Sequence, residues 1–459
     1  MPHPWIPNSY IKDLMLRELG VSSVLELFSD IPQELLLKRE LNVGYGSPLP
    51  EYRLRRLFND ILSRNKFRYA IPPFLGGGMC LHYVPATVKH LASRSEFYTA
   101  YTPYQPEIAQ GLTQALFEYQ SLMAELYGVD VVNASMYNGS TAMAEAIRLA
   151  VRVTGRKAVV LPRNMHPEIL EVARTWSEPV GISLIKVGYD KESGSVDVVE
   201  LEKAVREWKP AAVVIQTPNF FGVIEERIDE IASLAKESGS LVVVYEDPIF
   251  LGVLEAPGKL GADIVVGDTS SIGSGLNFGG PTAGILGIRD PEGKLLKQLP
   301  GRLIGYTRTV DGSEGGFIMV LQTREQHIRR ERATSNITTN SALEAVKAAI
   351  YVSLLGPHGL KKLGEALAGR TEYLVRALRK AGLELAFEKG VYLREVTVRY
   401  ARIAELRTFL KSQGIYIGPL LGRFFKELDD CCLMCTTELH TKEDIDLLVR
   451  LIEEFLRGA

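Results

Sequence analysis

The sequence predicts an α/β protein with a mainly parallel sheet. Short apolar runs alternate with amphipathic stretches of helical length, which indicates parallel strands joined by helices on both faces of one sheet. With 459 residues, 46% of them hydrophobic and 24% charged, the chain can bury a sizeable core and form two or three structural units. The apolar runs are Ala158–Leu161, Ile182–Val187, Ala211–Gln216, Leu241–Tyr245 and Asp263–Val266, and the amphipathic stretches are 167–176, 198–208 and 228–238.

Helical patterns precede this sheet. The predicted elements are a mostly helical region at 11–40, a helix at 112–126, a short strand at 129–134, a tight loop at 137–141 and an Ala-rich helix ending near 153. The helix at 112–126 is the clearest of them, because its apolar residues recur at i, i+3, i+4 and i+7 over four turns. We expect residues 1–60 to form an N-terminal helical arm and residues 61–335 to form a large α/β domain.

A second, smaller unit follows. A glycine-rich stretch at 273–284 and a charged segment at 324–332 lead into it. Its predicted elements are helices at 341–355 and 360–381, a strand at 392–400, a helix at 403–412, a strand at 431–437 and a helix at 442–456. Thr441 and Asp444 have the spacing of a capping box at the start of the last helix. We therefore expect residues 336–459 to form a small C-terminal α+β domain.

Composition and charge exclude several classes of protein. Lys and Arg number 53 and Asp and Glu 55, so the net charge of 53 − 55 = −2 gives no general attraction to nucleic acid. The first ten residues lack a basic stretch followed by an apolar one, and no run of about 18 apolar residues occurs. Four cysteines are too few for a disulfide framework. We expect a cytoplasmic protein that binds neither nucleic acid nor membrane.

Common catalytic and metal signatures are absent. The sequence contains no GxxxxGK[ST], HExxH or GxSxG, and the Gly76–Gly78 run lies in a proline-flanked loop. Residues 432–435 (CLMC) have CxxC spacing, but a zinc site needs a second pair of ligands and only Cys80 remains. We expect buried small side chains at 432–435 rather than a metal or redox site, and no metal site elsewhere.

One segment could hold an anion. Residues 138–141 (NGST) open a predicted helix, where free N–H groups and the helix dipole favour negative charge and the hydroxyls add donors. Taken alone, the segment is more typical of a helix N-cap. Its place before a wound sheet, with Asp247 at a later strand end, is the layout of pyridoxal-phosphate (PLP) enzymes, in which such a carboxylate keeps the pyridine nitrogen protonated.

A PLP enzyme also needs a lysine. Its amine binds the cofactor's aldehyde and usually lies a few tens of residues beyond the aspartate. No lysine occurs in 261–287, and residues 268–273 (DTSSIG) occupy the expected place. Lys259 lies in a Pro-Gly loop before this region, and Lys294 lies in a charged turn after it. Either the chain is not a PLP enzyme, or it has lost its own cofactor site.

Two polar blocks stand out. Residues 98–111 (YTAYTPYQPEIAQG) display three tyrosines and several amides on a backbone that Pro103 and Pro106 keep extended. Such a loop fits a site or interface, and equally a surface loop pinned by packed rings. Residues 324–340 (REQHIRRERATSNITTN) are by themselves typical of a solvated helix followed by Ser and Thr capping.

Together these blocks resemble glycine decarboxylase, the PLP-dependent P-protein of the glycine cleavage system. Residues 98–111 are similar to that family's strongest N-terminal motif, and residues 324–340 to its second. Further matches are Gly76–Gly78 with His82, the loop at 137–142 and Gly279-Gly280-Pro281. The resemblance covers nearly the whole chain.

The resemblance implies a PLP-transferase fold of type I and a divided enzyme. In some members the enzyme is split into two homologous subunits, and only subunit 2 carries the PLP lysine. The length and the missing lysine fit subunit 1. The resemblance then implies a heterotetramer with two copies of each chain, which decarboxylates glycine and passes the aminomethyl group to the lipoyl disulfide of the H-protein, as a glycine dehydrogenase (aminomethyl-transferring). It implies PLP on the partner subunit and none held covalently by this chain.

The resemblance also implies site residues, because this fold commonly builds its sites at subunit interfaces. No catalytic residue of the chain's own is expected. The residues expected to line the partner's site are Tyr98, Tyr101, Thr102, Tyr104, Gln105, Glu107 and Gln110. Those expected as relics are the phosphate cradle Asn138, Gly139, Ser140 and Thr141 and the pyridine-nitrogen partner Asp247. Two alternatives stay open: a scaffold or regulatory partner that only stabilises subunit 2, and an independent PLP enzyme using Lys259 or Lys294.

Overall fold

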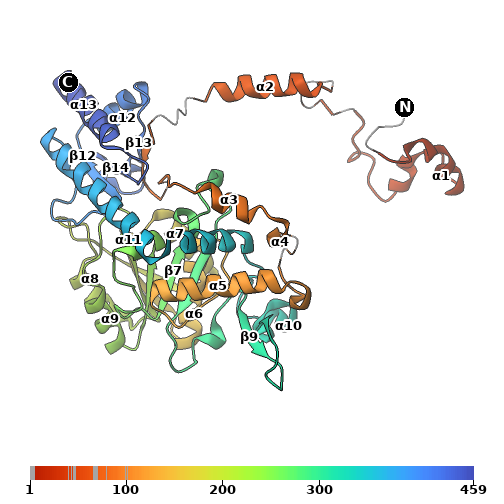
Figure 1. Cartoon of the computed structure of the whole chain (residues 1–459), viewed down its shortest axis with the longest axis horizontal. Coiled ribbons are helices and arrows are strands. Elements are labelled where there is room, and N and C mark those ends of the chain that lie inside the picture. The colour runs from red at the N-terminus through yellow and green to blue at the C-terminus, as the bar shows by residue number, and fades with distance from the viewer. Residues whose placement is uncertain are drawn as a thin grey trace. The chain divides into compact units, whose positions relative to one another are not determined.

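The chain divides into two compact units, Met1–Phe67 and Arg68–Ala459 (Figure 1). The computed structural model describes residues 6–39, 41–42, 44, 48–65, 71–78, 80–98, 100 and 102–458. Among these residues, no helix combines the length and the apolar character that a membrane span requires. The expected domain boundaries after residues 60 and 335 stay predictions.

The first unit contains short helical elements. They are α1 (Lys12–Glu18), a 3₁₀ turn (Val24–Phe28) and α2 (Glu51–Ser63). The prediction that residues 11–40 are mostly helical is wrong in extent, because no described residue between Phe28 and residue 39 is helical. The longest helix of this unit, α2, lies mostly within the expected helical arm at 1–60, although the sequence pattern predicts no separate helix at its residues. It places Leu54, Phe58 and Ile61 at helical spacing, and all three side chains are exposed.

The second unit is built on the predicted sheet. Its seven strands lie in the order β2-β8-β7-β6-β5-β3-β4. Strands β3 to β7 are the five predicted apolar runs and pair in parallel, whereas β8 pairs antiparallel with β7 and β2 antiparallel with β8. The strand bounds are β2 Val131–Val132, β3 Ala158–Pro162, β4 Ser183–Val187, β5 Ala212–Thr217, β6 Leu241–Glu246, β7 Ile264–Asp268 and β8 Gly284–Ile288. The prediction of a mainly parallel sheet is confirmed.

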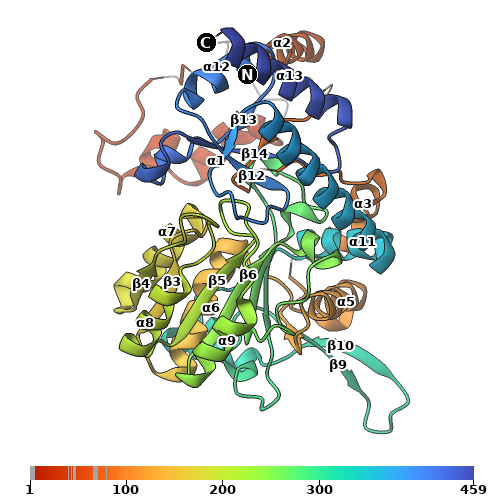
Figure 2. The ribbon, with the colours of Figure 1, turned by 90° about the vertical axis from the view of Figure 1, so that its left-hand side faces the viewer.

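Helices cover both faces of this sheet (Figure 2). One buried core lies between the sheet and α6 and α7, and a second lies between the sheet and α5, α8, α9 and the first part of α11. The helix bounds are α5 Gln110–Tyr127, α6 Gly139–Thr154, α7 Pro167–Ser177, α8 Val198–Trp208, α9 Ile228–Glu237 and α11 Ala342–Lys380. Helix α5 ends at Gly128, which adopts the left-handed conformation typical of a C-cap.

The unpredicted strand β8 depends on two glycines. A Cβ at Gly284 would lie 2.3 Å from the Asn138 carbonyl oxygen, and one at Gly287 would lie 2.8 Å from the Val132 side chain. Glycine is therefore required where β8 passes under the start of α6 and against β2. The same glycines hid the strand, because GILGI lacks the continuous β-branched run that marks a buried strand.

A smaller antiparallel sheet follows along the chain. It consists of β11 (Glu384–Leu385), β12 (Glu395–Arg399) and β14 (Cys431–Cys435), packed on α12 (Ile403–Ser412) and α13 (Lys442–Gly458). These elements and the two-part helix α11, broken at Gly356 and Pro357, confirm the predicted order. The capping box also forms, since the Asp444 N–H donates to Thr441 Oγ1 at 3.2 Å and the Thr441 N–H donates to Asp444 Oδ2 at 2.8 Å.

The remaining elements border the two sheets. They are β1 (Phe74–Leu75), which pairs in parallel with β13 (Ile417–Gly418), the helices α3 (Ala86–Ala92), α4 (Ser95–Tyr98) and α10 (Gln326–Arg329), and the hairpin β9 (Ile304–Arg308) with β10 (Gly315–Met319). The hairpin projects beyond the main sheet (Figure 2). Strand β1 carries the Gly76–Gly78 segment to the edge of the small sheet, where it becomes one wall of the site.

Candidate functional site

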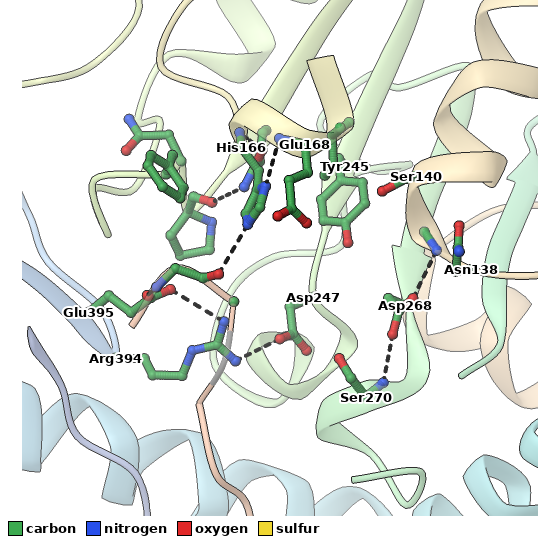
Figure 3. Close-up of a pocket in the computed structure, with 18 of the residues that line it drawn as sticks. Asn138, Ser140, His166, Glu168, Tyr245, Asp247, Asp268, Ser270, Arg394 and Glu395 are labelled. Carbon is green, nitrogen blue, oxygen red and sulfur yellow. Dashed lines mark hydrogen bonds and ion pairs between the residues drawn. The ribbon is translucent and has the colours of Figure 1, made fainter. Parts of the chain in front are cut away.

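A pocket of about 320 Å³ lies where the carboxyl ends of β6 and β7 meet the amino end of α6 (Figure 3). Side chains and backbone at this edge converge because parallel strands end together, which is where α/β folds bind ligands. Gly77 and Gly78 form part of the opposite wall, together with Arg394 and Glu395 from the start of β12. The pocket therefore lies between the main sheet and the small sheet.

The amino end of α6 holds a carboxylate of the same chain. The Gly139 N–H donates to Asp268 Oδ2 at 2.8 Å, and the Thr282 hydroxyl donates to the same oxygen at 3.0 Å. The Ser270 N–H donates to Asp268 Oδ1 at 2.9 Å. Burial raises the pKa of Asp268, and the N–H donors from Gly139 and Ser270 oppose that rise. Asp268 thus supplies the negative charge that a helix amino end favours.

Asn138 is the N-cap of α6. Its side-chain oxygen accepts the Thr141 N–H at 2.8 Å, which uses a second free N–H of the first turn. Asn138, Gly139 and Ser140 line the pocket, whereas Thr141 does not. A Cβ on Gly139 would lie 2.7 Å from the Tyr245 hydroxyl, so the helix start packs directly against β6. The local geometry is that of a capped helix with an internal acid at its end.

Asp247 is paired with an arginine. Its Oδ2 accepts a hydrogen bond from Arg394 Nη1 at 2.6 Å, and its Oδ1 accepts the Ser271 hydroxyl and the Ile249 N–H. The Arg394 guanidinium lies 4.7 Å from the centroid of the Phe250 ring and is 7% exposed. This buried ion pair crosses the pocket from the main sheet to the small sheet, as Figure 3 shows.

The polar loop predicted to reach another site lies outside this pocket. None of its described residues is among the pocket's lining residues. Tyr98, Tyr104, Gln105, Glu107 and Ile108 expose their side chains, and we call these five residues the loop face. Tyr101 lies outside the described residues.

Buried contacts underneath hold the loop face in place. Thr102 is buried, and its hydroxyl lies 2.6 Å from that of Thr339, which joins the two long polar motifs. The Gln110 side chain donates to the Phe317 carbonyl oxygen at 2.9 Å and accepts the Phe317 N–H at 2.9 Å, so it fastens α5 to the hairpin. With both ends of its amide engaged, Gln110 supports the loop.

Arg302 is the residue that sequence reasoning missed here. It is 4% exposed, and its Nη2 donates to the Thr338 carbonyl oxygen and, at 3.2 Å, to the Tyr104 hydroxyl. Its guanidinium also lies 5.1 Å from the centroid of the Tyr104 ring. Glu325 Oε2 lies 3.9 Å from its Nη1, and burial raises the pKa of Glu325. No motif includes Arg302, so the sequence offered no signal for it.

Comparison with known proteins identifies the family. The sequence matches the glycine cleavage system P-protein family over residues 5–452. The chain belongs to this family. It is 45% identical to the probable glycine dehydrogenase (decarboxylating) subunit 1 of Saccharolobus islandicus, covering 100% of this chain and 99% of that protein. It is 47% identical to the protein of the same name in Pyrococcus horikoshii, covering 99% and 100%.

Solved structures agree with this P-protein assignment. A glycine decarboxylase (P-protein) of the glycine cleavage system, crystallised in an inhibitor-bound form, superposes with a TM-score of 0.85 at 37% identity over 99% of this chain and 100% of that one. A NifS-like protein (TM-score 0.62, 17% identity, 85% of this chain and 100% of that one) shares the fold alone. The P-protein chain thus has the type I fold of PLP-dependent enzymes, as predicted.

The pocket of this P-protein does not fit a covalently held PLP. No lysine lines it. Lys259 pairs with Glu255 and Lys294 with Glu292, and the lysine side chains are 68% and 74% exposed. Asp268 accepts the Gly139 N–H at the amino end of α6, and Arg394 forms an ion pair with Asp247. These positions leave neither a lysine for the aldehyde nor an unpaired aspartate for the pyridine nitrogen.

Proposed function

We propose that this chain is subunit 1 of a two-subunit glycine dehydrogenase (decarboxylating). A homologous subunit 2 carries PLP on its lysine, with two copies of each chain in the assembly. The complex decarboxylates glycine and transfers the aminomethyl group to the lipoyl H-protein. The observation that carries the proposal is the pocket in which Asp268 and Arg394 engage the groups that PLP would need. The names of the relatives, subunit 1, support the division.

In this proposal the loop face lines the partner's site. PLP, when bound there, takes up the electron pair left on glycine as carbon dioxide departs. Tyr104, Gln105 and Glu107 offer hydroxyl, amide and carboxylate groups that hydrogen-bond within or beside a polar site. The buried Thr102 and Arg302 fix the backbone and the ring of Tyr104, which reduces the entropy lost when these groups are positioned.

Exposed apolar side chains support an obligate partner. Exposed side chains of this kind include Leu54, Phe58, Ile61, Phe278 and Val310. Exposed apolar side chains of this size are often covered in an assembly, and obligate interfaces bury about 2,000 Å² or more. Because the net charge is only −2, we expect assembly to depend on apolar burial and to weaken little with salt.

Reconstitution tests the proposal. Each chain is purified alone, the homologous lysine-bearing chain is added, and glycine–carbon dioxide exchange and assembly mass are measured. We expect exchange only in the mixture, a mass of two copies of each chain, and a borohydride-reduced PLP adduct that maps to one lysine of subunit 2. An adduct on Lys259 or Lys294 of this chain would make it an independent PLP enzyme. A subunit 2 that is fully active alone would leave this chain as a scaffold.

A further inference from the structure

Two buried cysteines far apart in the sequence lie in contact. The Cys80 and Cys435 sulfurs are 2.6 Å apart, although 355 positions separate the residues. Their exposures are 5% and 1%. A disulfide bond is about 2.05 Å long, so the two sulfurs are already within about 0.6 Å of bonding distance. The expectation that residues 432–435 provide only packing overlooked this contact, because Cys80 reaches β14 from a different part of the chain.

The backbone on both sides of the pair is fixed. Strand β1 pairs with β13, and the Gly76 N–H continues this ladder by donating to the Gly418 carbonyl oxygen at 2.7 Å. A Cβ on Gly76 would lie 3.1 Å from the Leu433 Cβ, so Gly76 packs directly against β14. Cys435 ends β14, which pairs with β12 over its whole length. The β12–β14 ladder therefore fixes Cys435, and the pairing of β1 with β13 fixes the chain up to Gly76, four residues before Cys80.

We propose that Cys80 and Cys435 form a disulfide that fastens the Gly76–Gly78 segment to the small sheet. The oxidant is a disulfide, either of low molecular weight or in a dithiol–disulfide oxidoreductase. Both S–H bonds break, the two sulfurs lose two electrons and two protons in all and bond to each other, and the oxidant's disulfide is reduced to two thiols. Gly77 and Gly78 line the pocket, so the bond secures one of its walls.

The other cysteines of β14 provide an internal comparison. The Cys431 thiol donates to Asp430 Oδ1 at 3.1 Å and the Cys432 thiol donates to the Leu433 carbonyl oxygen at 3.4 Å. Among the described residues, neither sulfur contacts another sulfur. Cys432 packs in the core of the small sheet, on the face opposite to Cys435. Pairing is thus specific to Cys80 and Cys435.

Thiol counting and peptide mapping test the proposal. The full chain is incubated with oxidised glutathione, denatured and alkylated. We expect two alkylated cysteines and a cross-linked peptide containing Cys80 and Cys435. Cys80→Ala should show three alkylated cysteines, and the matched control Cys432→Ala should show one. Four alkylated cysteines, a glutathione adduct in place of the cross-link, or a bond through Cys431 or Cys432 would overturn the proposal.

Thermal unfolding gives an independent measurement. A disulfide that closes so long a loop restricts the unfolded chain, so oxidation should raise Tm by about 3 °C. Reduction with dithiothreitol should reverse the shift in the native chain and in Cys432→Ala. Cys435→Ala, which cannot form the bond, should show equal Tm values with and without reductant. If neither oxidised glutathione nor dithiothreitol changes the Tm of the native chain, the proposed cross-link is contradicted.

Discussion

Asp247 and Asp268 face groups of their own chain, whereas Gln105 and Glu107 extend into solvent. Both regions are polar and both are fixed by buried contacts. In the pocket, however, Asp247 and Asp268 are matched internally by a guanidinium and by N–H and hydroxyl donors. On the loop face, the buried residues Thr102 and Arg302 hold the base, and the functional groups beyond it stay available.

The difference shows where another molecule can be recognised. A ligand that binds Asp247 or the start of α6 must compete with an ion pair or a helix cap, each of which stabilises the chain. A partner meeting the loop face displaces only water from groups that are already positioned. In our proposal the chain has therefore kept the shape of a type I site, and its contribution to catalysis comes from the loop face.

The largest expected effect comes from removing Arg394. Arg394→Ala removes the cation that pairs with Asp247, a carboxylate whose side chain is 17% exposed, so the free energy of unfolding should fall by about 3 kcal/mol in urea denaturation. Arg402→Ala is the control, since its pair with Glu405 is 43% and 59% exposed and should cost under about 1 kcal/mol. The double variant Arg394→Leu with Asp247→Asn should recover part of the loss. If Arg394→Ala and Arg402→Ala lower the free energy of unfolding equally, the ion pair in the pocket does not stabilise the chain more than an exposed one.

A pH dependence comes next. Glu225 is buried beside the pocket residue Asn219. Its carboxylate accepts hydrogen bonds from neutral groups, among them the Asn164 and Asn219 side-chain amides at 2.8 Å, and no described cation pairs with it. Burial raises its pKa to about 7. Because the folded pKa lies above the unfolded value, its stabilising contribution is complete below about pH 4.5 and is lost as pH rises through 7. The loss should be about 3 kcal/mol.

Glu225→Gln removes this titration. Urea denaturation at pH 5 and pH 8 should show the variant gaining stability relative to the native chain as pH rises, because only the native chain then ionises a buried acid. Glu226→Gln alters an exposed neighbour and should keep the native pH profile. If Glu225→Gln and the native chain lose stability in parallel, another group controls this pH range.

Loss of Arg302 tests the support beneath the loop face. Arg302→Gln cannot reach both Tyr104 and Thr338, so the loop face should shift and exchange in the assembled complex should fall about 10- to 100-fold. Arg308→Gln, on the exposed end of β9, should retain activity. Arg302→Lys should recover part of the activity by keeping the charge. Full exchange by assembled Arg302→Gln would show that this support is not needed.

The smallest effects come from the exposed groups themselves. Tyr104→Phe and Glu107→Gln each remove one hydrogen-bonding group, which should lower exchange about 2- to 10-fold with the assembly mass unchanged. Glu118→Gln, an exposed acid on α5 outside the loop face, should have no effect. Native activity in both loop variants would favour the scaffold function.

Much of the fold could be predicted from local pattern. Strands β3 to β7 are continuous apolar runs, and α5 repeats its apolar residues at helical spacing, so both are visible without tertiary contacts. Strand β8 was not predicted because Gly284 and Gly287 are required by close contacts with residues distant in sequence, and these contacts leave no local pattern. The bounds of the N-terminal helix α2 could not be predicted within the helical arm expected at 1–60, because none of its described residues is buried and packing does not select its sequence.

The site was predictable only in outline. The position of Asp247 after an apolar run and of Asn138 before a helix placed both at one sheet edge. Arg394 could not be assigned, because the small sheet brings it across 147 positions of sequence to Asp247. Asp268 was visible in DTSSIG, but that segment was considered for the lysine it lacks and not for the acid it contains.

Helix α11 links the two sheets mechanically. Its Leu360 and Leu367 pack in the core of the main sheet, and Leu374 and Leu378 pack in the core of the small one. The break at Gly356 precedes all four residues, so it lies within the first core and is no hinge between the two. The span from Leu367 to Leu374 is one continuous rod, and it fixes how far apart the walls of the pocket stand. Because α11 has no break in this span, we expect the distance between the two sheets to stay constant when a molecule enters or leaves the pocket.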